Sequence, residues 1–360
     1  MTSKDQQNSH QLPEKIIFDT DAGVDDAHAL LMLDGCSPRR IQLLAVTCVA
    51  GNVKLPQVLK NISHIFGHCS FTKVPIYGGA GRPLISKLPP GYELYHGRDG
   101  LGNTTTAMKI AQASSLDTSI NAVQALINLV QQHPKEVNVC AVGPLTNLAL
   151  AERLWPDFSR NLKSVCIMGG NMYGEGNVTP SAEFNFYCDP EAAHIVLHDF
   201  KCEKILITWE LCKLYQLPQE NYEELFRINT VKADFLSRIS QQAVKVHKES
   251  LQVCDQLAAA CACYPEIITK ATKYPCKVSL CGETRGQVII DRVNFWTDFP
   301  PESQTTIVEE LDVILEGRRV IFIMCGIFFC CSVIFSGPFG LLYGKSSVVS
   351  IFLYASFYQG

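Results

Sequence analysis

The composition of this 360-residue chain is that of an ordinary globular protein, with 47% hydrophobic and 18% charged residues. Such a chain is too apolar to be disordered and long enough to enclose a large core. Its 31 basic and 35 acidic residues give a net charge of −4, which leaves no positive surplus for a nucleic-acid backbone. The 16 cysteines lie within apolar runs without paired spacing, so we expect buried, reduced thiols rather than a disulfide framework.

The chain divides into three predicted parts. Residues 1–13 are polar and are expected to be a disordered N-terminal segment, and they contain no apolar stretch that could serve as a signal peptide, which predicts a cytoplasmic protein. Residues 14–317 are predicted to form one domain, because no linker rich in Pro, Gly or Ser and no block of like charge interrupts them. Residues 318–360 form an apolar tail of different composition.

Within the predicted domain, short runs rich in Val, Ile and Cys alternate with segments of helical periodicity. In chain order, strands are predicted at residues 15–21, 41–51, 74–79, 137–145, 164–170 and 202–209, and the longest helices at 25–35, 118–134, 144–154 and 189–200. This alternation predicts an α/β fold with a mostly parallel sheet covered by helices on both faces. Nearly every predicted strand ends in a polar or glycine-rich cluster. The ligand crevice of such a sheet lies outside the carboxyl ends of its strands, so we expect the functional residues there.

Four aspartates follow the first predicted strand within eight residues: Asp19, Asp21, Asp25 and Asp26. Carboxylates packed this closely raise one another's pKa values or require a cation. Oxygen ligands without a nearby His or Cys favour Ca²⁺ or Mg²⁺ over zinc. The alternative is that Asp25 and Asp26 only cap a helix while Asp19 and Asp21 lie in a solvated turn.

The stretch from Asp19 to Ala27 resembles the N-terminal signature of the inosine/uridine-preferring nucleoside hydrolases, Asp-x-Asp-x-Gly-x-Asp-Asp-Ala. Segments similar to that family follow in the family's order over about residues 14 to 315: Gly51-Asn52, Val74–Gly79, His96-Gly97, Gly143–Asn147, Met168–Gly170, Gly176-Asn177, Ala182–Asn185 and Asp189–Ala192. The resemblance implies the nucleoside hydrolase fold, with a Rossmann-like core. It also implies a Ca²⁺-dependent enzyme that cleaves the N-glycosidic bond of purine and/or pyrimidine ribonucleosides into ribose and free base. A homodimer or homotetramer with a role in nucleoside catabolism and salvage is implied as well.

The resemblance also implies a metal site. Asp21, Asp26 and Asp255 are expected to bind the Ca²⁺ ion together with the main-chain carbonyl of Val142, and Asp21 is expected to take the proton of the attacking water. Asp19 is expected to lie behind these ligands without contacting the ion.

The substrate residues implied by the resemblance come from several predicted loops. The residues expected to hold the ribose hydroxyls or pack beside the sugar are Asp25, Asn52, Asn177, Glu183, Phe184 and Asn185. His96 matches a histidine in a mobile loop near the base, where the glycines at 97, 100 and 102 would let the loop close over the substrate and exclude water.

Cys254 departs from the best-known members of the family, which carry His before the last metal-binding aspartate. A thiol is protonated at neutral pH and can donate a hydrogen bond, although weakly. Cys254 is therefore a candidate acid for the leaving base. The alternatives are that Cys254 is simply a wall of the pocket, and that the chain is a catalytically weak nucleoside-binding protein.

The tail has a single charged residue, Lys345, after Val320. Residues 320–343 are long enough for one membrane span, but Gly and Pro interrupt the run. A membrane anchor and a divergent C-terminus both fit this pattern, and the anchor is the less favoured of the two.

Overall fold

The computed structural model describes residues 12–38, 40–71, 73–88, 93–107, 115–246 and 249–312, and the backbone of 314–315 and 318–319. Its largest sheet contains the strands β1 (Glu14–Thr20), β2 (Ile41–Cys48), β3 (Ile76–Gly78), β4 (Leu116–Asp117), β5 (Val137–Ala141), β6 (Ser164–Met168), β7 (Glu203–Ile207), β10 (Ile268–Tyr274) and β13 (Thr305–Leu311). Three two-stranded sheets pair β8 (Leu217–Pro218) with β9 (Ser250–Leu251), β11 (Cys276–Val278) with β12 (Val288–Ile290), and β14 (Ile314–Leu315) with β15 (Arg318–Arg319).

Along the sequence, most helices come between successive strands of the large sheet. They are α1 (Val24–Cys36), α2 (Leu55–Phe66), α3 (Glu93–His96), α4 (Ala122–Gln132), α5 (Thr146–Leu154), α6 (Phe158–Asn161), α7 (Phe184–Cys188), α8 (Pro190–Asp199), α9 (Trp209–Leu214), α10 (Gln219–Phe226), α11 (Val231–Val246) and α12 (Cys254–Cys263). Single 3-10 turns occur at Thr105–Ala107, Pro265–Ile267, Gly282–Thr284 and Pro301–Ser303.

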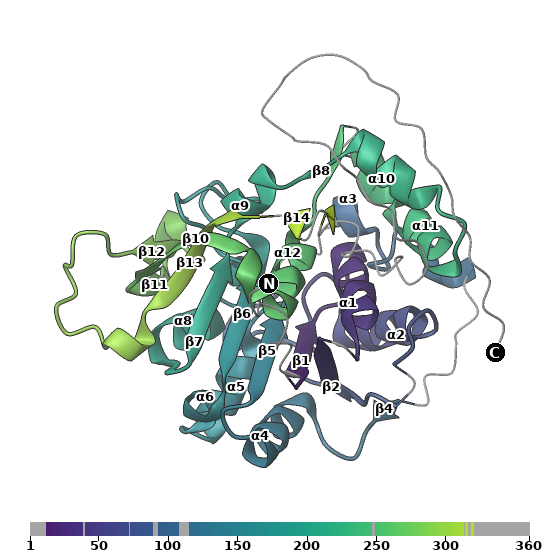
Figure 1. Cartoon of the computed structure of the whole chain (residues 1–360). Helices are drawn as coiled ribbons and strands as arrows, with labels where there is room; N and C mark the ends of the chain where they lie inside the picture. Colours follow the sequence, from purple (N-terminus) through teal and green to yellow (C-terminus); the bar gives the residue numbers. More distant parts are fainter. Residues whose placement is uncertain are drawn as a thin grey trace, which may run out of the picture.

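The large sheet has the strand order β10-β13-β7-β6-β5-β1-β2-β3-β4 (Figure 1). Neighbouring strands are parallel except for β10, which runs antiparallel to β13 at one edge. The carboxyl ends of the central parallel strands therefore meet along one edge of the sheet, where the loops after them come together.

Two hydrophobic cores lie on the two faces of the sheet. One is shared with α1, α2, α11 and α12, and the other with α4, α5 and α8. In β1, Ile16 and Phe18 face the first core and Ile17 the second, because successive side chains of a strand point to opposite faces. Burial on both faces explains why the central strands are almost continuously apolar.

The predicted α/β fold with a mostly parallel sheet is confirmed. The six predicted strands correspond to β1, β2, β3, β5, β6 and β7, and the four predicted helices to α1, α4, α5 and α8. The pairing of β13 beside β7 and the antiparallel edge strand β10 were not predicted. Residues 1–11 and 320–360 lie outside the described residues, so the predicted disorder of the first segment and the nature of the tail stay predictions.

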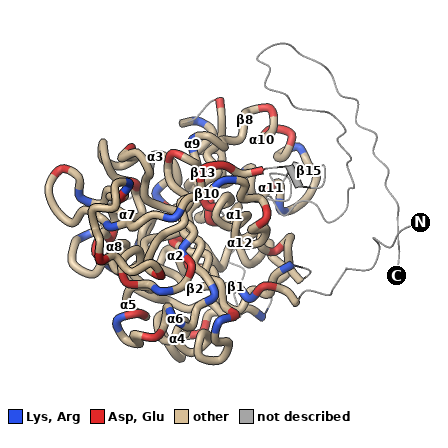
Figure 2. The backbone as a smooth tube through the Cα atoms, turned by 60° about the vertical axis from the view of Figure 1, so that its left-hand side comes forward, with Lys and Arg blue, Asp and Glu red and all other residues tan. Residues whose placement is uncertain are grey.

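The described surface carries both signs of charge. Blue and red segments are interspersed along the described chain in Figure 2, without one continuous basic stretch. The described cysteines are all free thiols, and all of them except Cys69 and Cys281 are buried. Among the described helices, none is long and apolar enough to cross a membrane.

Candidate active site

A pocket that is open to solvent lies at the carboxyl ends of the central strands. Most of the predicted site residues line it, although they come from loops far apart in the sequence. Its walls are formed by Asp25, Asn52, Tyr95, His96, Val142, Met168, Asn177, Glu183, Phe184, Asn185, Trp209, Gln252, Cys254 and Asp255.

The loop between β1 and α1 is held by the carboxylate of Asp26. One oxygen of this carboxylate accepts hydrogen bonds from the Thr20 hydroxyl and from the Ala22 amide, at 3.1 Å from the amide. The other accepts from the Gly23 amide at 2.7 Å. Ala22 has a left-handed backbone with φ of 55°, which an alanine rarely adopts. The capping bonds to Asp26 therefore stabilise the turn that places the acidic residues.

Asp19, near the end of β1, and Asp21, within this turn, are both fully buried. The Asn52 amide donates to Asp21 Oδ2 at 2.6 Å. Asp19 Oδ2 accepts from the Thr47 hydroxyl at 2.6 Å and from Asn147 Nδ2 at 2.8 Å. Asp19 thus ties β1 to β2 and α5.

Three carboxylates converge at the pocket wall. Asp25 and Asp26 begin α1, Asp255 begins α12, and one oxygen of each lies within 4.8 Å of the others. Burial, followed by repulsion from Asp25 and Asp26, raises the pKa of Asp255 well above its usual value. Burial also raises the pKa of Asp25 to about 6.

Unpartnered oxygens indicate what these carboxylates are suited to hold. Within the described part of the chain, Asp19 Oδ1, Asp21 Oδ1 and Asp25 Oδ1 are buried and accept no hydrogen bond. Leaving buried carboxylate oxygens without a partner is costly. Since the donor set consists of oxygens alone, these residues fit a hard divalent cation. Asp21 itself lies outside the group of three, and burial, with repulsion from Asp26 and Asp25, raises its pKa.

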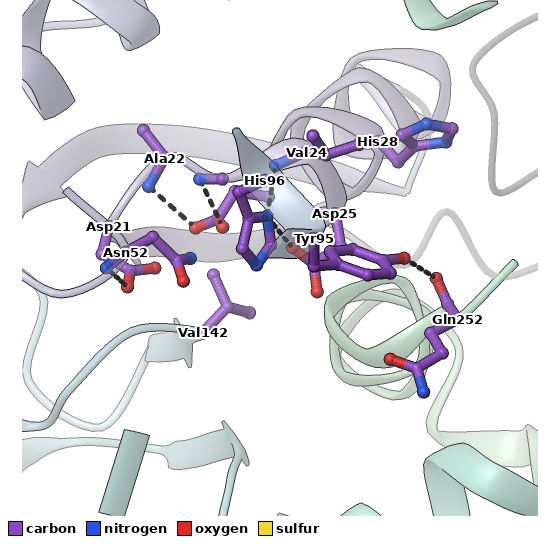
Figure 3. A network of polar contacts seen from close by, with 12 residues as sticks. Asp21, Ala22, Val24, Asp25, His28, Asn52, Tyr95, His96, Val142 and Gln252 are labelled. Atoms are coloured by element: carbon purple, nitrogen blue, oxygen red, sulfur yellow. Dashed lines mark hydrogen bonds and ion pairs between the residues drawn. The ribbon is translucent and has the colours of Figure 1, made fainter. Parts of the chain in front are cut away.

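His96 lies directly over the start of α1 (Figure 3). Its Nδ1 accepts a hydrogen bond from the Val24 amide at 3.1 Å and lies 3.7 Å from Asp25 Oδ1. Because Nδ1 is an acceptor, the proton of the neutral ring is on Nε2. Burial lowers the pKa of His96 to about 4, so the ring stays neutral at physiological pH.

The opposite wall is organised by Glu183, which caps α7. Its carboxylate accepts hydrogen bonds from the amides of Gly170 and Asn185 at 2.8 and 2.9 Å, and burial raises its pKa to about 7. Asn185 Nδ2 donates to the main-chain carbonyl of Val142 at 2.9 Å, which fixes that carbonyl at the pocket. Asn177 Oδ1 is buried and has no hydrogen-bond partner among the described residues.

Comparison with known proteins identifies the family. The family model described as inosine-uridine preferring nucleoside hydrolase matches residues 16–314. The chain belongs to the nucleoside hydrolase family. The inosine-uridine preferring nucleoside hydrolase of Crithidia fasciculata is 33% identical over 308 residues, which cover 84% of this chain and 94% of that protein. The corresponding protein of Leishmania major is 32% identical over 307 residues, with the same coverage.

Solved structures of nucleoside hydrolases share the fold. A plant nucleoside hydrolase superposes with a TM-score of 0.79 at 26% identity and covers 88% of this chain and 99% of its own. An inosine-guanosine nucleoside hydrolase superposes with a TM-score of 0.76 at 28% identity and covers 87% and 98%. This nucleoside hydrolase is therefore an enzyme that acts on N-glycosyl bonds.

Cys254 is the first residue of α12 in this nucleoside hydrolase and lies at the pocket wall. Its thiol contacts that of Cys212 on α9. The hydrogen bond with Cys212, together with burial and the nearby charge of Asp25, raises the pKa of Cys254 well above its usual value. The thiol therefore carries its proton at neutral pH, which makes it a donor but a weak acid.

Four residues of the pocket wall were not predicted from the sequence: Tyr95, Met168, Trp209 and Gln252. Met168 ends β6 and Trp209 follows β7 after one residue, so the rule of strand carboxyl ends could have found both. Tyr95 and Gln252 had no such signal. They meet only in the folded chain, where the Tyr95 hydroxyl donates to the Gln252 carbonyl at 3.2 Å (Figure 3).

Proposed function

We propose that this protein catalyses the Ca²⁺-dependent hydrolysis of the N-glycosidic bond of purine and/or pyrimidine ribonucleosides, releasing ribose and the free base. The observation that carries the proposal is the set of buried carboxylates with unpartnered oxygens at the wall of a pocket lined by polar side chains. The names of the two protozoan relatives, which prefer inosine and uridine, support the substrate class.

The residues that would hold the calcium ion are Asp21, Asp26 and Asp255 together with the carbonyl of Val142. When bound, the ion supplies a positive charge that acidifies water and orients the ribose hydroxyls. Asp25 belongs to the same cluster of oxygens and lines the pocket, so it can reach both the cation and a ribose hydroxyl.

Cleavage leaves an oxocarbenium-like ribose, so the attacking water must lose a proton on one face of the sugar. Asp21 is the proposed general base, since its Oδ1 has no hydrogen-bond partner among the described residues, and burial with repulsion from Asp26 raises its pKa.

The sugar is held by residues that already form the walls of the pocket. The residues proposed to bind its hydroxyls are Asp25, Asn52, Asn177, Glu183 and Asn185, and the ring of Phe184 is proposed to pack beside it.

The nucleobase departs from the opposite face of the sugar and gains a proton from the protein. His96, with its proton on Nε2, and the protonated thiol of Cys254 are the two proposed donors. His96 also belongs to the segment proposed to close over the substrate, which would exclude water from the reacting bond.

The test is release of ribose from inosine and from uridine by the purified protein, with Ca²⁺ and with EDTA. We expect turnover that requires Ca²⁺ and falls at least about 100-fold in Asp21→Ala, the lower end for a lost general base. Asp157→Ala, which changes an exposed aspartate outside the pocket, is the matched control and should keep full activity. Calorimetric binding of both nucleosides without turnover would instead support the alternative of a catalytically weak binding protein.

We also propose that residues 14–317 form the hydrolase domain of a cytoplasmic homodimer or homotetramer that serves nucleoside catabolism and salvage. Light scattering of the purified protein tests the oligomeric state, and a monomer would contradict it. Comparison of membrane fractionation between the full chain and a 1–317 truncation tests the tail, and equal solubility would dismiss an anchor.

A further inference from the structure

Two helices that begin at the active site also contact each other at their other ends. α1 begins next to Asp25 and Asp26 and ends at Cys36, while α12 begins at Cys254 and Asp255 and ends at Cys263. The helices pack against each other and lie side by side in Figure 1. Their first turns supply the three converging carboxylates, and their last residues are two cysteines whose thiols are in contact.

The surroundings of this thiol pair favour a thiolate at Cys36. The Cys36 sulfur lies 3.6 Å from the Tyr264 hydroxyl oxygen, and the Arg40 guanidinium lies 4.6 Å from the centre of the Tyr264 ring. The hydrogen bond from Cys263, with smaller effects of Tyr264 and Arg40, lowers the pKa of Cys36 in spite of burial. Cys36 itself is buried, with 4% of its surface exposed, and it is followed along the chain by the exposed Pro38 and by Arg40, whose side chain is 44% exposed.

The thiol pair at the pocket has the opposite environment. Cys254 and Cys212 are also in contact. Burial is the main cause that raises the pKa of Cys212, the hydrogen bond with Cys212 is the main cause that raises the pKa of Cys254, and the charges of Asp25 and Glu183 raise both further. Among the described cysteines, Cys36 is the one whose pKa is lowered. Since the thiolate is the reactive form, the Tyr264 hydroxyl beside Cys36 and the Arg40 guanidinium over the Tyr264 ring favour oxidation at Cys36 over the pocket pair.

We propose that Cys36 and Cys263 form a thiol oxidation site, where a hydroperoxide converts the pair into a disulfide that joins the ends of α1 and α12. The Cys36 thiolate attacks the peroxide O–O bond, which gives a sulfenic acid at Cys36 and releases the second oxygen as water once protonated. The sulfur of Cys263 then attacks the Cys36 sulfur, and the sulfenic oxygen leaves as a second water. Two thiols and one hydrogen peroxide thus yield one disulfide and two waters.

The test is peptide mapping of the reduced full-length protein after treatment with one equivalent of hydrogen peroxide, with iodoacetamide to block the remaining thiols. We expect a cross-linked peptide pair containing Cys36 and Cys263, lighter by two hydrogens and separated by dithiothreitol. Cys281→Ser, which removes an exposed thiol, should give the same product, and Cys36→Ser should not. A dominant link between Cys212 and Cys254, or no link at all, would overturn the proposal.

A second measurement uses the wild-type protein alone. The disulfide would close a loop from residue 36 to residue 263, so the melting temperature should rise by several degrees after oxidation and return on reduction. An unchanged or lower melting temperature of the linked protein would contradict a disulfide that fits the native helix packing. Neither measurement depends on nucleoside hydrolysis, so the oxidation site and the proposed function can fail independently.

Discussion

Removal of the cation should weaken the fold most strongly at the pH where the buried carboxylates are ionised. Burial raises the pKa of Asp25 from 3.8 to about 6 and that of Asp19 from 3.8 to about 7. An acid whose pKa is raised by folding keeps its proton to higher pH in the folded chain than in the unfolded chain. Without calcium, its contribution to stability is therefore complete below about pH 4 and is lost as the pH rises through about 6 to 7.

The magnitude follows from the size of the shift. For Asp25 alone, a pKa of about 6 in place of 3.8 corresponds to about 3 kcal/mol less stability at pH 8 than at low pH. Calcium acts in the opposite direction, because it binds the ionised carboxylates. At 100 times its dissociation constant it would add about 2.7 kcal/mol to the free energy of unfolding. Protons compete for the same oxygens at pH 5, so the gain should be smaller there.

Urea unfolding followed by tryptophan fluorescence, with calcium and with EDTA, measures this gain at pH 5 and at pH 8. We expect a clearly larger gain at pH 8, and a reduced gain in Asp255→Asn, which removes one carboxylate of the cluster. Glu302→Gln, which changes an exposed carboxylate far from the pocket, should behave as the wild type. An equal gain at both pH values, or an unchanged gain in Asp255→Asn, would refute the reasoning.

Further changes test individual groups. His96→Ala should lower kcat by about 100-fold, and since the pKa of His96 is lowered to about 4, the wild-type pH–rate profile should contain no histidine step between pH 6 and 8. Cys254→Ala should slow turnover of inosine only if the thiol protonates the base, and an unchanged kcat would remove that role. Asn185→Ala should raise the calcium dissociation constant about tenfold by releasing the Val142 carbonyl, as measured by calorimetry. Phe186→Ala, at a fully buried ring, should lower the free energy of unfolding by about 3–5 kcal/mol in urea titrations.

Local patterns in the sequence predicted the central strands and the residues at their carboxyl ends. The alternation of apolar runs and helical segments is enough for this, because burial on both faces leaves a continuous apolar signal in β1, β5 and β6. The acidic turn of Asp19 to Asp26 was visible because four carboxylates in eight residues have few purely structural explanations. Its place beside Asn52 depends on the parallel pairing of β1 with β2, and Asn52 was expected at the site only from the resemblance to the family.

Other features depend on contacts between distant segments and had no local signal. The strand order that inserts β13 between β7 and β10 is decided by pairing over long distances in sequence. The convergence of Asp255 with Asp25 and Asp26 needs the packing of α12 on α1, and only the resemblance to the family had suggested it. The tautomer of His96 follows from one amide, that of Val24, which no sequence pattern identifies.

The position of β13 inside the sheet has a consequence for synthesis of the chain on the ribosome. β13 is the last strand of the large sheet in sequence, yet it lies between β7 and β10, so the sheet remains open on that side until residue 311 has left the ribosome. Asp26 emerges more than two hundred residues before Asp255. In the nascent chain, the edge of β7 thus waits for β13, and Asp25 and Asp26 wait for Asp255, an interval in which exposed strand edges favour chaperone binding.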